Sequence, residues 1–367
     1  MTPVAPDTDL HPVEDPARPP RRRAAGRAAL LLGLGAAVVA AIALGTSLGP
    51  VRVPLRDTVQ VVLYNISSDW FAKPDDPVFT QIVWQFRLPR ALLGAVVGAG
   101  LAAVGVVLQA VVRNPLADPY LLGVSSGASF GAVLVLVVGS ASVAGLGLSS
   151  AAFAGALVAT LLVYLLAQRA GRVTPFRLIL AGVSLAYLFQ ALYGLLLLRA
   201  NPHDVQGVLT WLFGSLGSTA WDDVGVPAVG VVAGTLYLFT QARPLNSLLA
   251  GEETAVSLGL DVARFRVRML VVTSVMVGVM VAVSGAIAFV GLIIPHLCRM
   301  LVGSDHRRLL PVAALTGAAF MVLMDLAARV VLAPTELPLS IVTAVFGVPF
   351  FIWLLRQREV GREARFG

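Results

Sequence analysis

The feature that most limits the fold of this chain is a series of long apolar runs. Eight runs of 16 to 23 residues hold very few charged side chains: 28–48, 91–112, 121–138, 151–167, 178–198, 224–240, 310–332 and 340–355. A helix of about 20 apolar residues crosses the ~30 Å hydrocarbon core of a bilayer. Only 13% of the residues are charged and the mean hydropathy is +0.86. These patterns predict an all-α, polytopic membrane protein surrounded by lipid.

A ninth apolar stretch, residues 270–303, is too long for one span and too short for two. Its 34 residues would form a helix of about 51 Å, whereas two full spans need about 40 residues. We therefore expect one full helix, a break near residues 284–291 and a shorter returning helix. Arginines flank both ends of the stretch, at 264–268 and 307–308, and two crossings place both groups on the cytoplasmic side. The total is about ten spans, with both termini cytoplasmic.

The domain organisation follows from these spans. Residues 1–26 are rich in proline and arginine and are expected to form a disordered cytoplasmic tail. The apolar run that follows is longer than the core of a cleavable signal, so we interpret it as a retained first span. Residues 27–357 are expected to form one ten-helix permease domain, and residues 358–367 a cytoplasmic C-terminal tail.

Several classes of function are disfavoured by composition. The chain has one cysteine, Cys298, and four scattered histidines, so we expect no disulfide, metal site or cofactor. Its one lysine, Lys73, lies in "FAKPDD" and not in the GxxxxGK[ST] pattern of an ATP-binding loop. The net charge of +7 is better explained by membrane topology than by nucleic-acid binding. No residue is a convincing catalyst, and any ATP-driven work must be done by another subunit.

Two arginines, Arg87 and Arg90, stand in "RLPR" at the start of the second span. The topology turns this end outward, where the positive-inside rule disfavours arginine. The residues alone leave two interpretations open. The side chains extend to lipid headgroups, or they have a function on the outer face.

Two inner segments combine turn and helix signals. "RNPLADP" follows the second span, and its prolines and Asn114 predict a turn that is either a gate or an ordinary connection. In residues 245–260, glycines bracket a short helical pattern with Glu252 near its start and with Ala255 and Leu258 on one face. An acidic helix with an exposed apolar face favours docking of a protein partner over lipid headgroups.

One carboxylate, Asp325, lies inside the span 310–332, four residues before Arg329. An acid–base pair at this spacing lowers the cost of burying either charge. A proton relay is the alternative interpretation, and it supports a proton-coupled secondary carrier as a rival function.

Several long motifs, in order, resemble the FecCD-type permeases. They are "RLPRALLGAVVGAGLAAVGVVLQAVVRNPLADPYLLGVSSGAS", "LILAGVSLAY", "GEETAVSLGL", "SGAIAFVGLIIPHLCRMLVGSDHRRLLP" and "ELPLSIVTAVFGVPFFIWLL". The similarity extends over roughly residues 30–357. Members of this family are the membrane subunits of bacterial ABC importers for iron-siderophores, haem and cobalamin.

The resemblance implies a type II ABC importer permease fold in the bacterial cytoplasmic membrane. The expected assembly is a homodimer, or a heterodimer with a related permease, on two cytoplasmic ATP-binding subunits, with an extracytoplasmic substrate-binding protein docked outside. The family's site residues transfer to docking arginines, an inner gate and an ATPase-coupling helix. In this sequence the docking positions are Arg87, Arg90 and Arg329, the gate positions are Asn114, Leu116, Pro175 and Phe176, and the coupling positions are Gly251, Glu252, Ala255, Leu258 and Gly259. Pro175 and Phe176 depart from the small hydroxyl residues usual in the family.

The expected function is therefore inward passage of a metal chelate, without chemistry on it. An iron(III)-siderophore is the first expectation, with haem and cobalamin as alternatives. The proton-coupled carrier and a sensory or scaffold protein are the rival classes.

Overall fold

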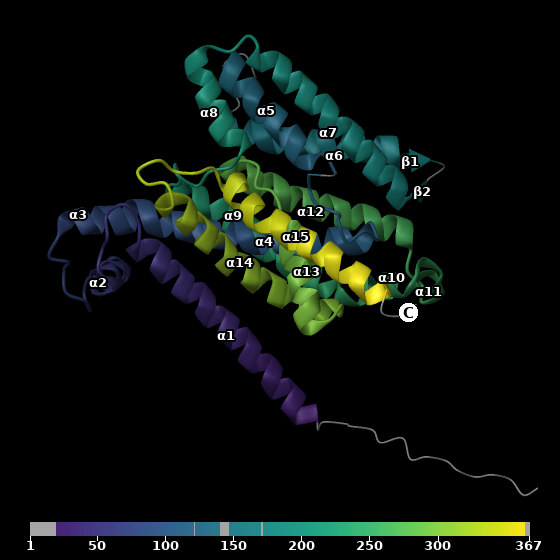
Figure 1. Ribbon diagram of the computed structural model, residues 1–367, viewed down its shortest axis with the longest axis horizontal. Helices are drawn as coiled ribbons and strands as arrows, with labels where there is room; N and C mark the ends of the chain where they lie inside the picture. The colour runs from purple at the N-terminus through teal and green to yellow at the C-terminus, as the bar shows by residue number, and fades with distance from the viewer. Residues whose placement is uncertain (1–19, 121, 140–146, 170–171, 364–367) are drawn as a thin grey trace, which may run out of the picture.

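The computed structural model describes residues 20–120, 122–139, 147–169 and 172–363 (Figure 1). Nearly all of them are helical, as predicted, apart from turns and a two-stranded antiparallel ribbon, β1 (Gln168–Arg169) and β2 (Arg172–Val173). The helices are α1 (Pro20–Ser47), α2 (Leu55–Ile66), α3 (Pro77–Thr80), the π-helix η1 (Gln81–Arg87), α4 (Leu88–Val111), α5 (Val124–Val138), α6 (Leu148–Ala167), α7 (Pro175–Leu197), α8 (Pro202–Leu212), α9 (Asp222–Thr240), α10 (Ala242–Ala250), α11 (Glu252–Ser257), α12 (Val262–Ser284), α13 (Val290–Val302), α14 (His306–Val330) and α15 (Leu339–Glu363).

The helices agree with the expected spans. Within the described residues, seven helices are long and apolar enough to cross a membrane, and three shorter apolar helices accompany them. The shorter ones are Val124–Val138, Val290–Val302 and Leu339–Trp353. One span includes η1 and runs without interruption from Pro77 to Val111, 35 residues in all. These helices support a multi-pass protein, and the seven long and three shorter ones together are consistent with the expected count of about ten.

The predicted break in the long apolar stretch is confirmed. The helix α12 ends at Ser284, and the returning helix α13 has 13 residues, about 20 Å. Gly285 has φ 64 and Phe289 has φ 70, both in the left-handed region. A Cβ on Gly285 would lie 2.2 Å from the Trp211 carbonyl oxygen, so the turn requires glycine for space as well as for conformation.

The centre of the bundle is α4, which is buried along most of its length. Glycines let its neighbours approach closely. A Cβ on Gly98 would lie 2.2 Å from the carbonyl oxygen of Gly317 on α14. The same kind of contact joins α5 to α6, where a Cβ on Gly127 would lie 2.3 Å from the Ala159 Cβ.

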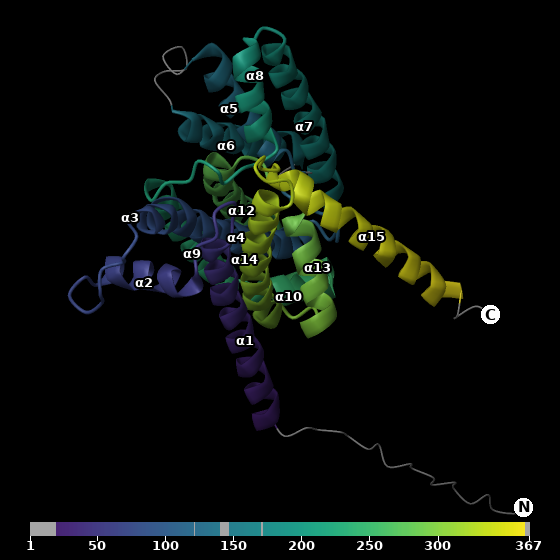
Figure 2. The ribbon, with the colours of Figure 1, turned by 60° about the vertical axis from the view of Figure 1, so that its left-hand side comes forward.

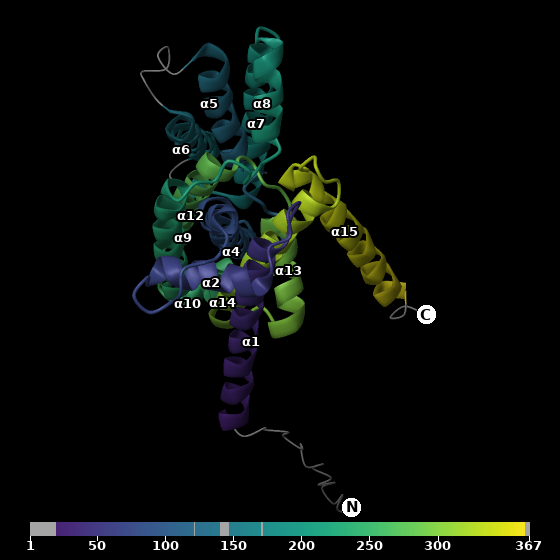
Figure 3. The ribbon, with the colours of Figure 1, turned by 90° about the vertical axis from the view of Figure 1, so that its left-hand side faces the viewer.

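The two ends of the bundle carry different elements (Figure 1). One end carries α2 and α3, and the other carries α10, α11 and the β1–β2 ribbon. The helix α1 begins, and α15 ends, toward the second end. Figures 2 and 3 show α5, α6, α7 and α8 grouped on one side of α12, with α1 at the periphery.

Helix boundaries differ from the expected tails. Residues 1–19 of the predicted N-terminal tail lie outside the described residues, but residues 20–26 already belong to α1. At the other end, α15 continues to Glu363, into the segment assigned to the C-terminal tail, and residues 364–367 lie outside the description.

Candidate functional site

A cluster of four charged side chains lies where α4 and α14 meet the loop before α15. The Arg90 guanidinium donates to Asp325 at 2.8–3.1 Å and to both carboxylate oxygens of Glu336 at 2.9 and 3.0 Å. Arg329 approaches the same Asp325 carboxylate at 3.1 Å and donates to the Gly45 carbonyl oxygen at 2.9 Å. The pairing of Asp325 with Arg329 four residues on is therefore confirmed, with Arg90 as an unexpected second partner.

The third arginine, Arg87, is held by the end of α1. It donates to the carbonyl oxygens of Thr46 at 3.2 Å and Ser47 at 3.0 Å, and also to Val51. Because carbonyl groups at a helix C-terminus carry partial negative charge, a guanidinium suits this position. Arg87 thereby ties α1 and the following loop to η1.

The structure thus brings the three arginines to the end that carries α2 and α3, but it directs their charges inward. Arg87, Arg90 and Arg329 are 7%, 8% and 4% exposed. Sequence reasoning missed Glu336, whose side chain is 42% exposed. The one sequence signal for Glu336 was its place as the acid that opens "ELPLS", shortly before α15 begins at Leu339. A docking carboxylate would have to reach Arg90 in competition with Glu336.

At the opposite end, α10 and α11 form a short bent pair of helices. The bend is at Gly251, with φ 127, and Gly259 follows α11 with φ 82. Both values lie where glycine is favoured. The predicted short helix is therefore present between the two glycines.

The exposed face of α11 differs from the expected one. Ala255 is fully buried against the protein, so the expectation that it shares an exposed apolar face with Leu258 is wrong. The exposed apolar side chains are instead Val256, at 60%, and Leu258, at 72%. The helix α11 is rotated about its axis relative to the expected orientation, so that the small Ala255 packs against the rest of the protein.

A buried arginine of α12, Arg266, joins this end together. Its guanidinium pairs with the carboxylate of Glu252 on α11. It also donates to the carbonyl oxygens of Val111, at the end of α4, at 3.3 Å and of Val173, in β2, at 3.4 Å. The Arg266 hydrogen bond lowers the pKa of Glu252, with burial opposing and the charges of Arg266 and Arg113 assisting. Sequence reasoning used Arg266 only as a topology charge, and no signal distinguished it from Arg264 and Arg268.

The predicted gate residues directly follow the two carbonyl groups that Arg266 binds. Asn114 accepts a hydrogen bond from the Leu116 backbone N–H at 2.9 Å, which forms a tight turn and leaves Leu116 51% exposed. Pro175 starts α7, and Phe176 next to it is 73% exposed. The two pairs lie on separate segments. One begins three residues after Val111 and the other two residues after Val173, the two residues whose carbonyl groups Arg266 binds.

The described ranges contain no group of three or more His, Cys, Asp or Glu side chains that could hold a metal ion. The charged side chains described above are engaged with one another or with backbone carbonyls. Their arrangement supports mechanical connections between helices.

Comparisons with known proteins agree with this architecture. The model of the FecCD transport family matches residues 37–357. The "Cobalamin import system permease protein BtuC" of Halobacterium salinarum is 47% identical over 279 residues, 76% of this chain and 74% of the relative. The "Vitamin B12 import system permease protein BtuC" of Citrobacter koseri is 41% identical over 288 residues, 78% of this chain and 85% of the relative.

Two solved structures share the fold. A structure described as an inward-facing ABC transporter of the metal-chelate type superposes with a TM-score of 0.77 at 34% identity, covering 89% of this chain and 98% of the other. PsaBC from Streptococcus pneumoniae, in complex with Fab, superposes with a TM-score of 0.51 at 18% identity, covering 72% and 89%. The second similarity concerns the fold alone.

Proposed function

The chain belongs to the FecCD transport family, and from this premise we propose that this ABC importer permease passes cobalamin across the membrane. The observation that carries the proposal is identity of 41–47% to permeases named for cobalamin or vitamin B12 import. This cargo replaces the iron(III)-siderophore of our first expectation, which the names of these relatives do not support. The similarity to a metal-chelate transporter agrees with either cargo.

The proposed assembly has two copies of this chain, two cytoplasmic ATP-binding subunits and one extracytoplasmic binding protein. The chain has no GxxxxGK[ST] motif, which supports a separate source of ATP hydrolysis. On this proposal the end with α10 and α11 faces the cytoplasm and the end with α2 and α3 faces outward.

The contacts of Arg266 support a pathway by which ATP hydrolysis in the partner subunits could be coupled to the gate segments. A shift of α11, caused by the ATP-binding subunits, would pull on Arg266 through Glu252. The same guanidinium holds the carbonyl groups that precede both gate segments. A small displacement of α11 would therefore reach Asn114–Leu116 and Pro175–Phe176 together, and rigid-body rocking of the subunits would complete the change of access.

The outer cluster supports a revised docking proposal. The guanidinium groups of Arg90 and Arg329 brace the outer end, and carboxylates of the binding protein reach Arg90 only by displacing Glu336. Arg-carboxylate contacts made in this way would be bidentate and would orient the partner.

Uptake experiments test the cargo. Cells of the source strain lacking this gene should lose accumulation of radiolabelled cyanocobalamin, and the gene should restore it. Labelled ferric hydroxamate siderophore is the parallel substrate. Loss of iron uptake with unchanged cobalamin uptake would replace the proposal with the siderophore alternative.

The proton-coupled carrier remains the rival class, and uptake into membrane vesicles prepared from the same cells tests it. We expect uptake to require ATP and the ATP-binding subunits and to persist when a protonophore collapses the pH gradient. Asp325, held between two guanidinium groups, has the surroundings of a structural carboxylate. Uptake that follows the proton gradient and ignores ATP would overturn the ABC mechanism.

A further inference from the structure

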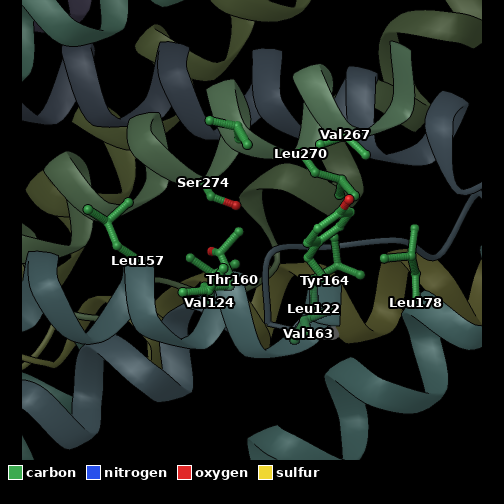
Figure 4. Close-up of a pocket in the computed structure, with 12 residues that line it drawn as sticks. Leu122, Val124, Leu157, Thr160, Val163, Tyr164, Leu178, Val267, Leu270 and Ser274 are labelled. Carbon is green, nitrogen blue, oxygen red and sulfur yellow. The ribbon is translucent and has the colours of Figure 1, made fainter. Parts of the chain in front are cut away.

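An apolar cavity of about 300 Å³ opens between α6 and α12, away from the charged clusters (Figure 4). Its wall is almost entirely aliphatic, with Leu157 and Leu161 of α6 facing Leu270 of α12. Thr160 uses its hydroxyl on the carbonyl oxygen of Ala156 in its own helix, so it offers little polarity. Ser274 and Tyr164 add two further hydroxyl groups to an otherwise apolar wall, so the cavity suits a hydrocarbon chain better than a polar ligand.

A second cavity, of about 720 Å³, continues the first toward the end with α11. Tyr164 and Val267 line both cavities, so the two lie side by side and together form one groove along α12. The second cavity is lined by Arg264 and Arg268, which lie one helical turn apart on the exposed face of α12.

The charges of this second cavity are not balanced. Asp261 pairs with Arg264 at 3.1 Å. Within the ranges that the structure describes, no ion pair involves Arg268. Two arginines and one aspartate leave the opening with a net positive charge, which complements an anion.

The dimensions of the joined groove match one leaflet of a bilayer. From Arg264 to Ser274, along ten residues of α12, the distance is about 15 Å. The hydrocarbon core is about 30 Å thick, so one leaflet accounts for about half of it. Tyr164 lies where the apolar part meets the charged part, and tyrosine favours the membrane–water interface.

We propose that this groove binds an anionic phospholipid of the leaflet next to α11, with an acyl chain between α6 and α12 and its phosphate at Arg264 and Arg268. The inference is independent of the cargo. The site would fasten α12, and with it Arg266, to the lipid at the end where coupling is proposed. A soluble phosphate would use only the arginines and leave the apolar cavity empty, which is why the groove favours a lipid.

Lipid retention by the full-length protein tests the proposal. The protein is equilibrated with equal amounts of phosphatidylglycerol and phosphatidylcholine in detergent, and retained lipids are counted by native mass spectrometry. We expect phosphatidylglycerol to be retained at least about fivefold over phosphatidylcholine, since each arginine near a membrane surface favours anionic lipid by roughly this factor. Arg264→Gln with Arg268→Gln should remove the preference.

Two further variants give the test its specificity. Thr160→Phe fills the apolar cavity, leaves both arginines in place and should also lower retention. Arg243→Gln with Arg307→Gln removes two exposed arginines elsewhere on the same end and should leave retention unchanged. Equal retention of the two lipids by the unaltered protein would overturn the proposal. A loss of phosphatidylglycerol retention in the Arg243→Gln, Arg307→Gln control as large as in the Arg264→Gln, Arg268→Gln variant would overturn it too. Displacement of the lipid by millimolar glycerol-3-phosphate would show a soluble-phosphate site and would also overturn it.

Discussion

Arg90 and Arg266 are both buried arginines that join several helices, yet their surroundings differ. Arg90 contacts two carboxylates, and the inner one, Asp325, is 1% exposed and shared with Arg329. Arg266 contacts one carboxylate, Glu252, on a six-residue helix at the surface, and two backbone carbonyls. Arg90 is thus fixed by buried charge on long helices, whereas Arg266 is attached to an element that can shift. On the proposed orientation, the difference predicts a rigid outer end, with α2 and α3, and a movable inner end, with α11.

Removing the shared carboxylate should have the largest effect. Asp325→Asn leaves Arg90 with only Glu336 and leaves Arg329 with no carboxylate partner in a buried setting. We expect a loss of about 3–5 kcal/mol in stability, measured as a lower unfolding temperature in detergent. Glu253→Gln, which likewise replaces an acid by its amide but at an exposed position, is the control. An unaltered unfolding temperature for Asp325→Asn would contradict the rigid role of this cluster.

Arg266→Lys should have a smaller effect on stability and a distinct effect on transport. Lysine keeps the charge but lacks the planar fork that reaches three acceptors at once. We expect a loss of roughly 1–3 kcal/mol, and ATP hydrolysis that continues while cargo uptake falls. Arg307→Lys, the same change at an exposed arginine outside both sites, is the matched control. If uptake and hydrolysis remain coupled in Arg266→Lys, the contacts of Arg266 with α11 and the gate segments do not transmit the movement of α11.

Glu336→Gln separates the two acids that hold Arg90. Because Glu336 is partly exposed and Asp325 keeps the guanidinium paired, we expect a loss of about 1 kcal/mol. Affinity for the binding protein should rise, because Arg90 is freed for a partner carboxylate. Surface plasmon resonance at low salt measures this affinity, and a decrease would assign docking to Glu336 itself.

The smallest effect should appear as pH dependence at the inner end. Since the pKa of Glu252 is lowered in the folded protein, its ion pair stabilises α11 above the ordinary carboxyl pKa of about 4.3 and is lost as pH falls through the lower value. A spin label at Val256→Cys should be equally ordered from pH 7 to about pH 5 and should become more mobile only at pH values below the ordinary carboxyl pKa of about 4.3. Adding Glu252→Gln should make the mobility high at every pH. Cys298, the one native cysteine, is buried and will not compete for the label.

Much of this fold was accessible from sequence because lipid imposes length and charge rules. The break after Ser284 followed from counting residues against bilayer thickness and from arginines at both ends of the stretch. The rotation of each helix about its own axis, which decides where its side chains point, could not be predicted from the sequence in this way. Arg90 and Arg329 lie together at one end of the bundle, as predicted, but nothing in an apolar run fixes whether a side chain points to solvent or to a neighbouring helix.

The same limit explains the errors at the inner end. Gly251 and Gly259 predicted the bounds of α11, since turn residues act locally. Ala255 was assigned to the wrong face because the burial of a short helix depends on partners distant in sequence. Arg266 could not be distinguished from its neighbours for that reason too, since its acceptors at Val111 and Val173 belong to other segments.

The uninterrupted rod from Pro77 to Val111 has a consequence for how the two surfaces communicate. Its 35 residues extend for about 52 Å, well beyond the ~30 Å thickness of the hydrocarbon core. A tilt of about 5° would move its ends by about 4.5 Å relative to each other at that length. In the proposed assembly, a partner that tilts the rod at one surface would therefore displace its other end. The hydrogen bonds along the helix would not need to change.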